Sequence, residues 1–251
     1  MWGLVYRCNL ALPCAPMRVA AIQFKPPKFR PADARSALAS LVIEAADDGA
    51  EVIVCPEMAI QGYVWPSAEA VRPLAEASDG PTFATFSRIA EQYGCWITVG
   101  FAEVFEGALY NSALVIGPDG SLVTTYRKVL LYLLDEQWAE RGNRRVAIDT
   151  GAAVSAVGIC MDLNDEGFRR FLGEHQPQQL WFLTNWIEEG FDVLQYWRQR
   201  IFPWSGVMIA ANTWGMDGEV EFSGRSLIWS AEGDVLCRAP RQGNHVLVAD
   251  V

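Results

Sequence analysis

Residues 154–162 read Val-Ser-Ala-Val-Gly-Ile-Cys-Met-Asp, and the interpretation of the whole chain starts from this stretch. A run of apolar residues ends at Cys160, and a polar stretch that opens a helix near Asp165 follows it. Such a run predicts a buried strand over residues 154–159. A thiol at a strand-to-helix elbow can act as a nucleophile, although an inert buried cysteine is the commoner case. Cys160 is therefore a candidate catalytic residue.

Outward from this stretch, strand-like and helix-like runs alternate, which favours an α/β fold. Turn signals at residues 117–120 (Gly-Pro-Asp-Gly) and 231–234 (Ala-Glu-Gly-Asp) predict two hairpins. The further predicted strands cover residues 18–24, 52–55, 95–101, 110–116, 121–126, 180–184, 207–212, 227–230, 235–238 and 245–251, and the long helices cover residues 32–47, 81–93, 165–174 and 192–204. A simple doubly wound sheet does not hold so many strands. We therefore predict one domain with two mixed sheets packed together and helices outside.

Composition excludes several classes of protein. The chain has 251 residues, of which 30 are acidic and 20 basic, for a net charge of -10. This balance argues against nucleic-acid binding, which depends on clusters of Lys and Arg. A hydrophobic content of 51% and an aromatic content of 12% argue against disorder. No apolar run approaches the roughly 20 residues that span a bilayer, so we expect a soluble protein without a membrane partner.

Cysteine and histidine usage narrows the chemistry further. The six cysteines form no C-x-x-C pair, which favours reduced thiols and a cytoplasmic location. Only two histidines are present, so a histidine-rich metal centre is not expected. Residues 1–16 could pass for a secretion signal, but polar residues and prolines interrupt the apolar stretch. We interpret residues 1–16 as an N-terminal extension or an upstream start, and residues 17–251 as the domain.

Two other segments carry polar residues at predicted strand ends. Glu57 follows the apolar run 52–55 and a proline. Burial there would raise the pKa of its carboxyl and suit it to general-base catalysis, but a charge that turns outward is the usual alternative. Lys128 follows the strand 121–126 and precedes an apolar stretch. By itself it would be read as a solvated surface lysine.

In the order Glu, Lys, Cys, these segments resemble the carbon–nitrogen hydrolase (nitrilase) superfamily. The resemblance covers residues 18–251 and is carried by Pro56-Glu57-Met58 with Gly62-Tyr63, Tyr110-Asn111-Ser112, Tyr126-Arg127-Lys128, Gly158-Ile159-Cys160-Met161-Asp162 and Phe222-Ser223-Gly224-Arg225-Ser226. It implies a four-layer α-β-β-α sandwich, assembly as a homodimer or higher homo-oligomer, and a hydrolase of non-peptide C–N bonds that needs no cofactor. The aromatic-rich helix over residues 192–204 could supply the assembly surface, or it could be ordinary core.

The resemblance also implies the roles of the site residues. Glu57 would act as the base and Cys160 as the nucleophile that forms a thioester. Lys128 and the backbone N–H of Met161 would stabilise the charge that develops on oxygen. A second glutamate, expected shortly after the lysine, would be Glu136, with its neighbour Asp135 as the rival. Either carboxylate could instead cap the following turn.

The sequence after the cysteine bears on the substrate. Cys160-Met161-Asp162-Leu163-Asn164 resembles the amino-terminal amidase branch, which deamidates Asn or Gln at protein N-termini. It lacks the arginine that other branches carry soon after the cysteine. Asp162 or Asp165 would bind the substrate ammonium group, unless both cap the helix near Phe168. Because the chain is short, the substrate could instead be a small amide. The alternatives for the whole protein are an ω-amidase, a carbamoyl amidase, a nitrilase or a non-catalytic binding module.

Overall fold

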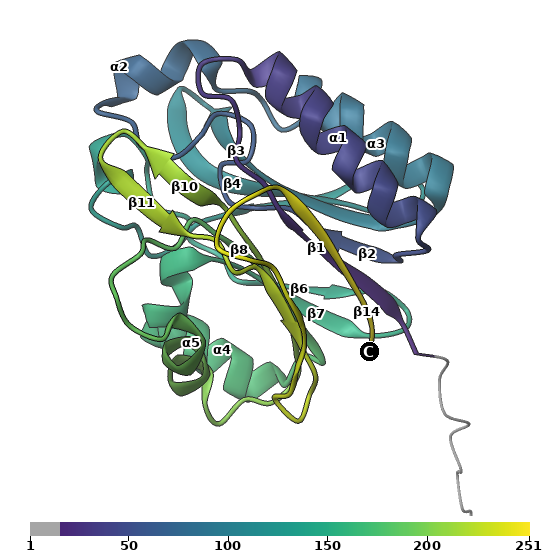
Figure 1. Cartoon of the computed structure of the whole chain (residues 1–251). Coiled ribbons are helices and arrows are strands. Elements are labelled where there is room, and N and C mark those ends of the chain that lie inside the picture. Colours follow the sequence, from purple (N-terminus) through teal and green to yellow (C-terminus); the bar gives the residue numbers. More distant parts are fainter. Residues whose placement is uncertain (1–15) are drawn as a thin grey trace, which may run out of the picture.

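Two six-stranded sheets pack face to face in a computed structural model of the chain, which describes residues 16–251. Helices cover the two outer faces (Figure 1). This arrangement is the four-layer α-β-β-α sandwich of mixed sheets that the sequence predicted. The predicted N-terminal extension, residues 1–16, and the question of a secretion signal lie outside the described residues except for Pro16.

The first sheet contains the N-terminal strands and the last strand of the chain. Its order is β14 (His245–Asp250), β1 (Arg18–Gln23), β2 (Val52–Val54), β3 (Trp96–Phe105), β4 (Ala108–Ile116) and β5 (Leu122–Arg127). Strands β1, β2 and β3 are parallel, and the other neighbours are antiparallel. The outer face is covered by α1 (Pro31–Asp47) and α3 (Pro81–Tyr93) (Figure 1). Between β2 and α3 lie the short α2 (Ala68–Val71) and η1 (Arg72–Leu74).

The second sheet repeats this plan with the remaining strands. Its order is β13 (Val235–Arg238), β12 (Leu227–Trp229), β9 (Val207–Asn212), β8 (Gln179–Thr184), β7 (Val154–Ile159) and β6 (Val146–Asp149). Its parallel strands are β7, β8 and β9, and its helices are α4 (Glu166–His175) and α5 (Val193–Ile201). A separate hairpin joins β10 (Trp214–Asp217) to β11 (Val220–Ser223), and two 3-10 turns, η2 (Asp135–Gln137) and η3 (Cys160–Asn164), follow β5 and β7.

The three strands that sequence analysis missed, β6, β10 and β11, have only four residues each. Two residues of β6 are exposed, and four of the eight residues in β10 and β11 are half-buried. Strand β6 has an apolar run of three residues and β11 alternates over four residues, and patterns this short are a weak signal of a strand. Their pairing therefore depends on neighbouring strands and not on local sequence.

Apolar side chains from both sheets meet in a shared core. Val54 of the first sheet belongs to the same buried cluster as Val157 and Ile209 of the second. That cluster continues beneath α4 and α5, where Trp197 is fully buried against Phe182 at 5.3 Å between ring centroids. Of the two interpretations of the 192–204 helix, Trp197 thus supports ordinary core.

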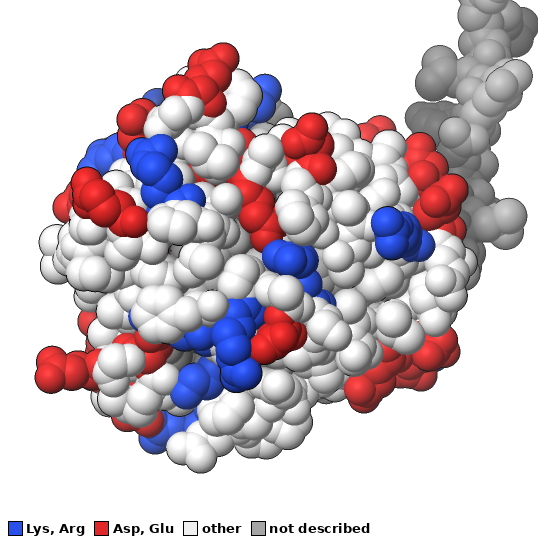
Figure 2. Space-filling view, turned by 90° about the horizontal axis from the view of Figure 1, so that it is seen from above, with Lys and Arg blue, Asp and Glu red and all other residues white. Residues whose placement is uncertain are grey.

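Other whole-chain features bear on the interpretation. The four described cysteines, Cys55, Cys95, Cys160 and Cys237, are free thiols. Among residues 16–251 no helix has the length and apolar character to cross a membrane. On the face shown in Figure 2, acidic and basic side chains are interspersed. The acidic excess of the chain therefore does not gather into one patch on that face.

Candidate active site

Three strand ends bring the predicted Glu57, Lys128 and Cys160 together between the sheets. Glu57 follows β2 and Lys128 follows β5 in the first sheet, whereas Cys160 follows β7 in the second. Glu57 and Lys128 are 1% and 0% exposed, so neither is the surface charge that its sequence context alone would suggest. Both charges lie close enough to the Cys160 thiol to change its pKa.

A network of buried hydrogen bonds surrounds Lys128. Its Nζ donates to Oε1 of Glu57 at 2.7 Å and to Oδ2 of Asp135 at 2.6 Å. The Asn111 side-chain amide donates to the same two carboxylates, at 2.7 Å and 2.9 Å. The Tyr63 hydroxyl donates to Asp135 at 3.1 Å. Each carboxylate is thus held by an ammonium and an amide, which is how buried charges are tolerated.

Asp135, and not Glu136, is the carboxylate beside Lys128, so the prediction for Glu136 is wrong. Glu136 is exposed and pairs with Arg141 at 3.1 Å. The reason is the local backbone: Asp135 begins the tight turn η2, and its carboxylate accepts from the N–H of Tyr132, three residues earlier, at 3.0 Å. The turn directs Asp135 inward and its neighbour outward. An aspartate is long enough here because the loop brings its backbone close to Lys128.

Burial and charge act in opposite directions on the three central groups. Burial raises the pKa of Glu57, and Lys128 only partly offsets this effect. Burial alone would lower the pKa of Lys128, but Asp135 and Glu57 hold it well above its usual value. Burial also raises the pKa of Cys160, with a further increase from Glu57 that Lys128 opposes. The resting Cys160 thiol therefore keeps its proton at neutral pH.

The backbone at Cys160 has an uncommon conformation. Its φ of 43° lies in the left-handed region, and Met58, directly after Glu57, has a φ of 48°. For non-glycine residues such angles are costly and collect at functional sites. Met161 follows within the first turn of η3, where N–H groups have no acceptor inside the helix. Its N–H therefore has no acceptor within η3, and Met161 lines a pocket that opens at Cys160.

Asp162 holds the elbow in place and does not face the substrate, so its predicted role in binding is wrong. The carboxylate is 0% exposed. It accepts hydrogen bonds from the N–H groups of Ile159 at 2.9 Å, Val129 at 3.0 Å and Leu130 at 2.9 Å, and from the Tyr126 hydroxyl at 2.6 Å. These four donors occupy both oxygens of the carboxylate. Asp162 therefore ties the Cys160 turn to the loop that follows Lys128.

Asp165 is also unavailable as the carboxylate for a substrate ammonium. It caps α4 by accepting from the N–H of Phe168 at 2.7 Å, and it pairs with Arg145. This is the helix-capping alternative that the sequence left open. Neither aspartate after the cysteine is free to bind substrate.

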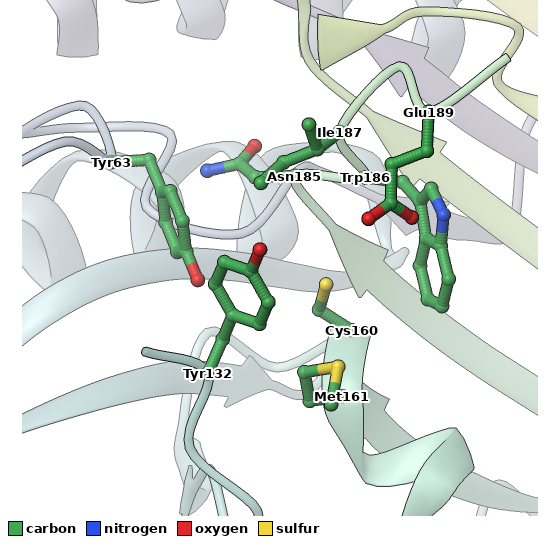
Figure 3. Close-up of a pocket in the computed structure, with 8 residues that line it drawn as sticks. All are labelled: Tyr63, Tyr132, Cys160, Met161, Asn185, Trp186, Ile187 and Glu189. Carbon is green, nitrogen blue, oxygen red and sulfur yellow. The ribbon is translucent and has the colours of Figure 1, made fainter. Parts of the chain in front are cut away.

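A pocket opens at Cys160 between the two sheets (Figure 3). It encloses a volume of about 40 Å³ that opens onto solvent, and it is lined by Tyr63, Tyr132, Cys160, Met161, Asn185, Trp186, Ile187 and Glu189. The backbone N–H of Asn185 donates to Oε2 of Glu57 at 2.7 Å, which links the pocket wall to the Glu57 carboxylate. The Sγ of Cys160 points into this space (Figure 3). The thiol therefore faces a small space that is open to solvent.

A second, larger pocket shares the Tyr63 and Asn185 wall. It encloses a volume of about 190 Å³, and the loop after β1 and the β10–β11 hairpin form much of it. Lys28 there pairs with Asp217 at 2.6 Å, and Asp217 also accepts from the N–H of Val64 at 3.0 Å. The hairpin that sequence analysis missed therefore forms one wall next to the site.

Comparison with known proteins identifies the family. The profile of the carbon-nitrogen hydrolase family matches residues 18–251. The chain belongs to this family. A protein N-terminal amidase of Schizosaccharomyces pombe is 26% identical over 71% of this chain and 78% of its own length. A nitrilase of Pyrococcus abyssi is 27% identical over 94% of this chain and 89% of its own length.

Solved structures share the fold of this carbon–nitrogen hydrolase. An amidase from Nesterenkonia sp. aligns with a TM-score of 0.81 at 20% identity, over 99% of this chain and 93% of its own. An N-terminal amidase aligns with a TM-score of 0.82 at 16% identity, over 94% and 98%. The hydrolase is thus an enzyme of the nitrilase superfamily whose relatives include amidases.

Sequence reasoning about the hydrolase missed several residues of the site. Asn111 and Tyr63 lay within segments that carried the resemblance, but a hydrogen bond to a catalytic group was not inferred for either. The clue was an asparagine inside an apolar strand, where a buried amide needs partners. Asn185 and Glu189 follow β8 and gave no motif. Only the folded chain shows that they line the pocket.

Proposed function

We propose that the chain is a cysteine-dependent amidohydrolase that releases ammonia from a carboxamide through a thioester intermediate. The buried Glu57–Lys128–Asp135 network beside the Cys160 pocket supports this proposal most strongly. A lysine held between two carboxylates stays protonated and can serve as a fixed positive charge. A glutamate with a raised pKa can accept and return a proton near neutral pH.

The proposed reaction has two steps of nucleophilic substitution. Glu57 accepts the proton of the Cys160 thiol, and the sulfur attacks the amide carbon. The Lys128 ammonium and the Met161 N–H stabilise the oxyanion. Glu57 then returns the proton to the nitrogen, and the C–N bond breaks to release ammonia. Water attacks the thioester after giving a proton to Glu57, which passes it to the departing thiolate, and the carboxylic acid leaves.

The finer proposal is that the amide belongs to Asn or Gln at a peptide N-terminus. The sequence after Cys160 and the N-terminal amidases among the relatives support it. Another structure of the Nesterenkonia sp. amidase shows acrylamide added at its active-site cysteine, which supports nucleophilic chemistry at Cys160. The second candidate is a small-molecule amidase or nitrilase. An omega-amidase of Danio rerio, 31% identical over 58% of this chain, and the small volume of the pocket favour it.

Ammonia release from a substrate panel tests the proposal. The panel contains peptides that begin with Asn or Gln, their N-acetylated forms, ω-amides of dicarboxylic acids, carbamoyl compounds and nitriles. We expect ammonia from at least one carboxamide and none with Cys160→Ala. Cys237→Ala is the control, because this thiol is free and lies on β13, outside the residues that line the pocket. Ammonia release by Cys160→Ala at the rate of the unaltered chain would overturn the proposal.

We also propose that the enzyme works as a homo-oligomer in the cytoplasm. The superfamily resemblance supports assembly, and Phe202, after α5, exposes 81% of its surface. Light scattering on the purified chain measures the number of copies. A mass of one chain at micromolar concentration would contradict the proposal.

A further inference from the structure

Among the residues that line the Cys160 pocket, one carries a full charge. Of the eight described lining residues, Glu189 is the only Asp, Glu, Lys or Arg. It lies on the loop between β8 and α5, and its carboxylate points over the pocket near Trp186 (Figure 3). It is also near enough to Tyr132 to help raise the pKa of that phenol, a shift due mainly to burial. The pocket therefore has a negative charge at its mouth and no cationic wall residue among those described.

The carboxylate of Glu189 is unpaired, in contrast to that of its neighbour. Glu188 pairs with Arg225 at 3.3 Å and with Arg241 at 3.2 Å. Within residues 16–251, the Glu189 side chain forms neither a hydrogen bond nor an ion pair. A surface glutamate without a partner is ordinary, but this one faces the space where the substrate must lie. It is available to a ligand.

The remaining wall also suits a cation. The rings of Tyr63, Tyr132 and Trp186 surround the pocket (Figure 3), and aromatic faces attract ammonium groups. Asn185 is 3% exposed, and its Oδ1 has no hydrogen-bond partner among the described residues. A buried amide oxygen without a donor is costly unless a ligand supplies one. An ammonium group carries donors for both Glu189 and Asn185.

We propose that Glu189 is a specificity-determining residue that pairs with an ammonium group of the substrate, so that the pocket selects amides whose amine lies a few bonds from the carboxamide. This inference rests on the proposed function, because it places that amide at Cys160. Asp162 and Asp165 are used within the fold, which leaves Glu189 as the carboxylate of the pocket. An N-terminal Asn or Gln is one substrate of this kind, and a small amino amide is another.

An isosteric pair of substrates tests the role of Glu189. 3-Aminopropanamide and butanamide have the same number of heavy atoms, and only the first carries an ammonium group. We expect kcat/KM of the unaltered enzyme to be higher for 3-aminopropanamide than for butanamide. In Glu189→Gln this preference should fall about tenfold, because the variant loses one charged hydrogen bond at a solvent-accessible site. Glu189→Lys should reverse the preference. The change should appear mainly in KM for the ammonium substrate.

Glu166→Gln is the matched control. Glu166 lies on α4, is exposed, and pairs only with Arg170 among the described residues. Its replacement removes the same charge and should leave the preference unchanged. An equal preference in Glu189→Gln and the unaltered enzyme would overturn the role of Glu189 while the amidase proposal stands.

A binding measurement separates the two proposals. If the unaltered enzyme releases ammonia from no amide, the proposed function fails, and the ammonium site is then tested without turnover. Saturation-transfer NMR on Cys160→Ala compares binding of the same two amides. Preferential binding of 3-aminopropanamide that is lost in the Cys160→Ala, Glu189→Gln double variant supports the site. Equal binding of both amides overturns it.

Discussion

At the scale of single residues, the site depends on how one buried cation is compensated. Lys128 is 0% exposed and meets two carboxylates, those of Glu57 and Asp135. An unpaired ammonium in such surroundings would lose its proton, whereas two carboxylates keep it charged. Asn111 bridges the carboxylates and limits their repulsion. Asp135 and Glu57 therefore both keep Lys128 protonated.

Replacement of Asp135 separates its role from that of Glu136. Asp135→Asn keeps the shape but removes a charge that holds Lys128 protonated and oriented. We expect kcat to fall on the order of a hundredfold or more and the free energy of unfolding to fall by about 1–3 kcal/mol. Glu136→Gln, at an exposed ion pair, should change both by little. Steady-state kinetics and urea unfolding measure the two effects, and a larger loss in Glu136→Gln would refute this assignment.

The pH dependence of kcat/KM reports the charge state of Glu57. The base must be a carboxylate, and burial raises its pKa above the usual value of 4.5 despite the nearby Lys128. Activity should therefore decline as the pH falls, with a midpoint above pH 4.5. Circular dichroism over the same range shows whether the chain stays folded. A midpoint at or below pH 4.5 in folded protein would contradict a raised pKa.

At the scale of elements, close packing between strands and turns positions the reacting groups. The turn at Glu57 lies directly against β3 because Gly100 has no side chain. A Cβ at Gly100 would come within 2.4 Å of the Pro56 carbonyl oxygen and 2.6 Å of the Glu57 Cα. The Cys160 turn is similarly fixed by Asp162, which binds backbone N–H groups of two different segments. Backbone contacts thus set the side-chain geometry of the site.

Gly100→Ala should displace the Glu57 turn. Since the nearest atoms are backbone atoms, we expect a loss of about 1–3 kcal/mol in the free energy of unfolding, as for other overpacked sites. Activity should fall more steeply than in a variant of equal stability elsewhere. Gly173→Ala in α4 is the control, because nothing lies within 4 Å of its added Cβ and alanine favours a helix. Equal behaviour of the two variants would argue against the close approach.

At the scale of the whole molecule, the two sheets unite one core and one site. Glu57 and Lys128 come from the first sheet, and Cys160 and Asn185 come from the second. The buried cluster between the sheets contains side chains of both. The ends of the described chain also pair, since the N–H of Met17 donates to the Val251 carbonyl at 2.9 Å. Neither sheet can bury its inner face without the other.

The chain should therefore unfold as one cooperative unit. We expect far-ultraviolet circular dichroism, tryptophan fluorescence and residual activity to be lost at the same urea concentration. The physical reason is that separation of the sheets exposes the shared core and divides the site at once. A loss of activity and fluorescence well before the loss of circular dichroism, in two separate transitions, would contradict this prediction.

The amino-acid sequence by itself determined the α/β class, most strand positions and the candidates Glu57, Lys128 and Cys160. Local signals suffice for the strands, because buried strands such as residues 154–159 are mostly apolar. The three candidates depended on the resemblance of their segments, taken together, to a known family. Only the tertiary structure decided between Asp135 and Glu136, assigned Asp162 to the fold, and brought Asn185 and Glu189 to the pocket. These choices depend on which way a turn directs adjacent side chains and on contacts between residues distant in the chain. Spacing along the sequence does not contain that information.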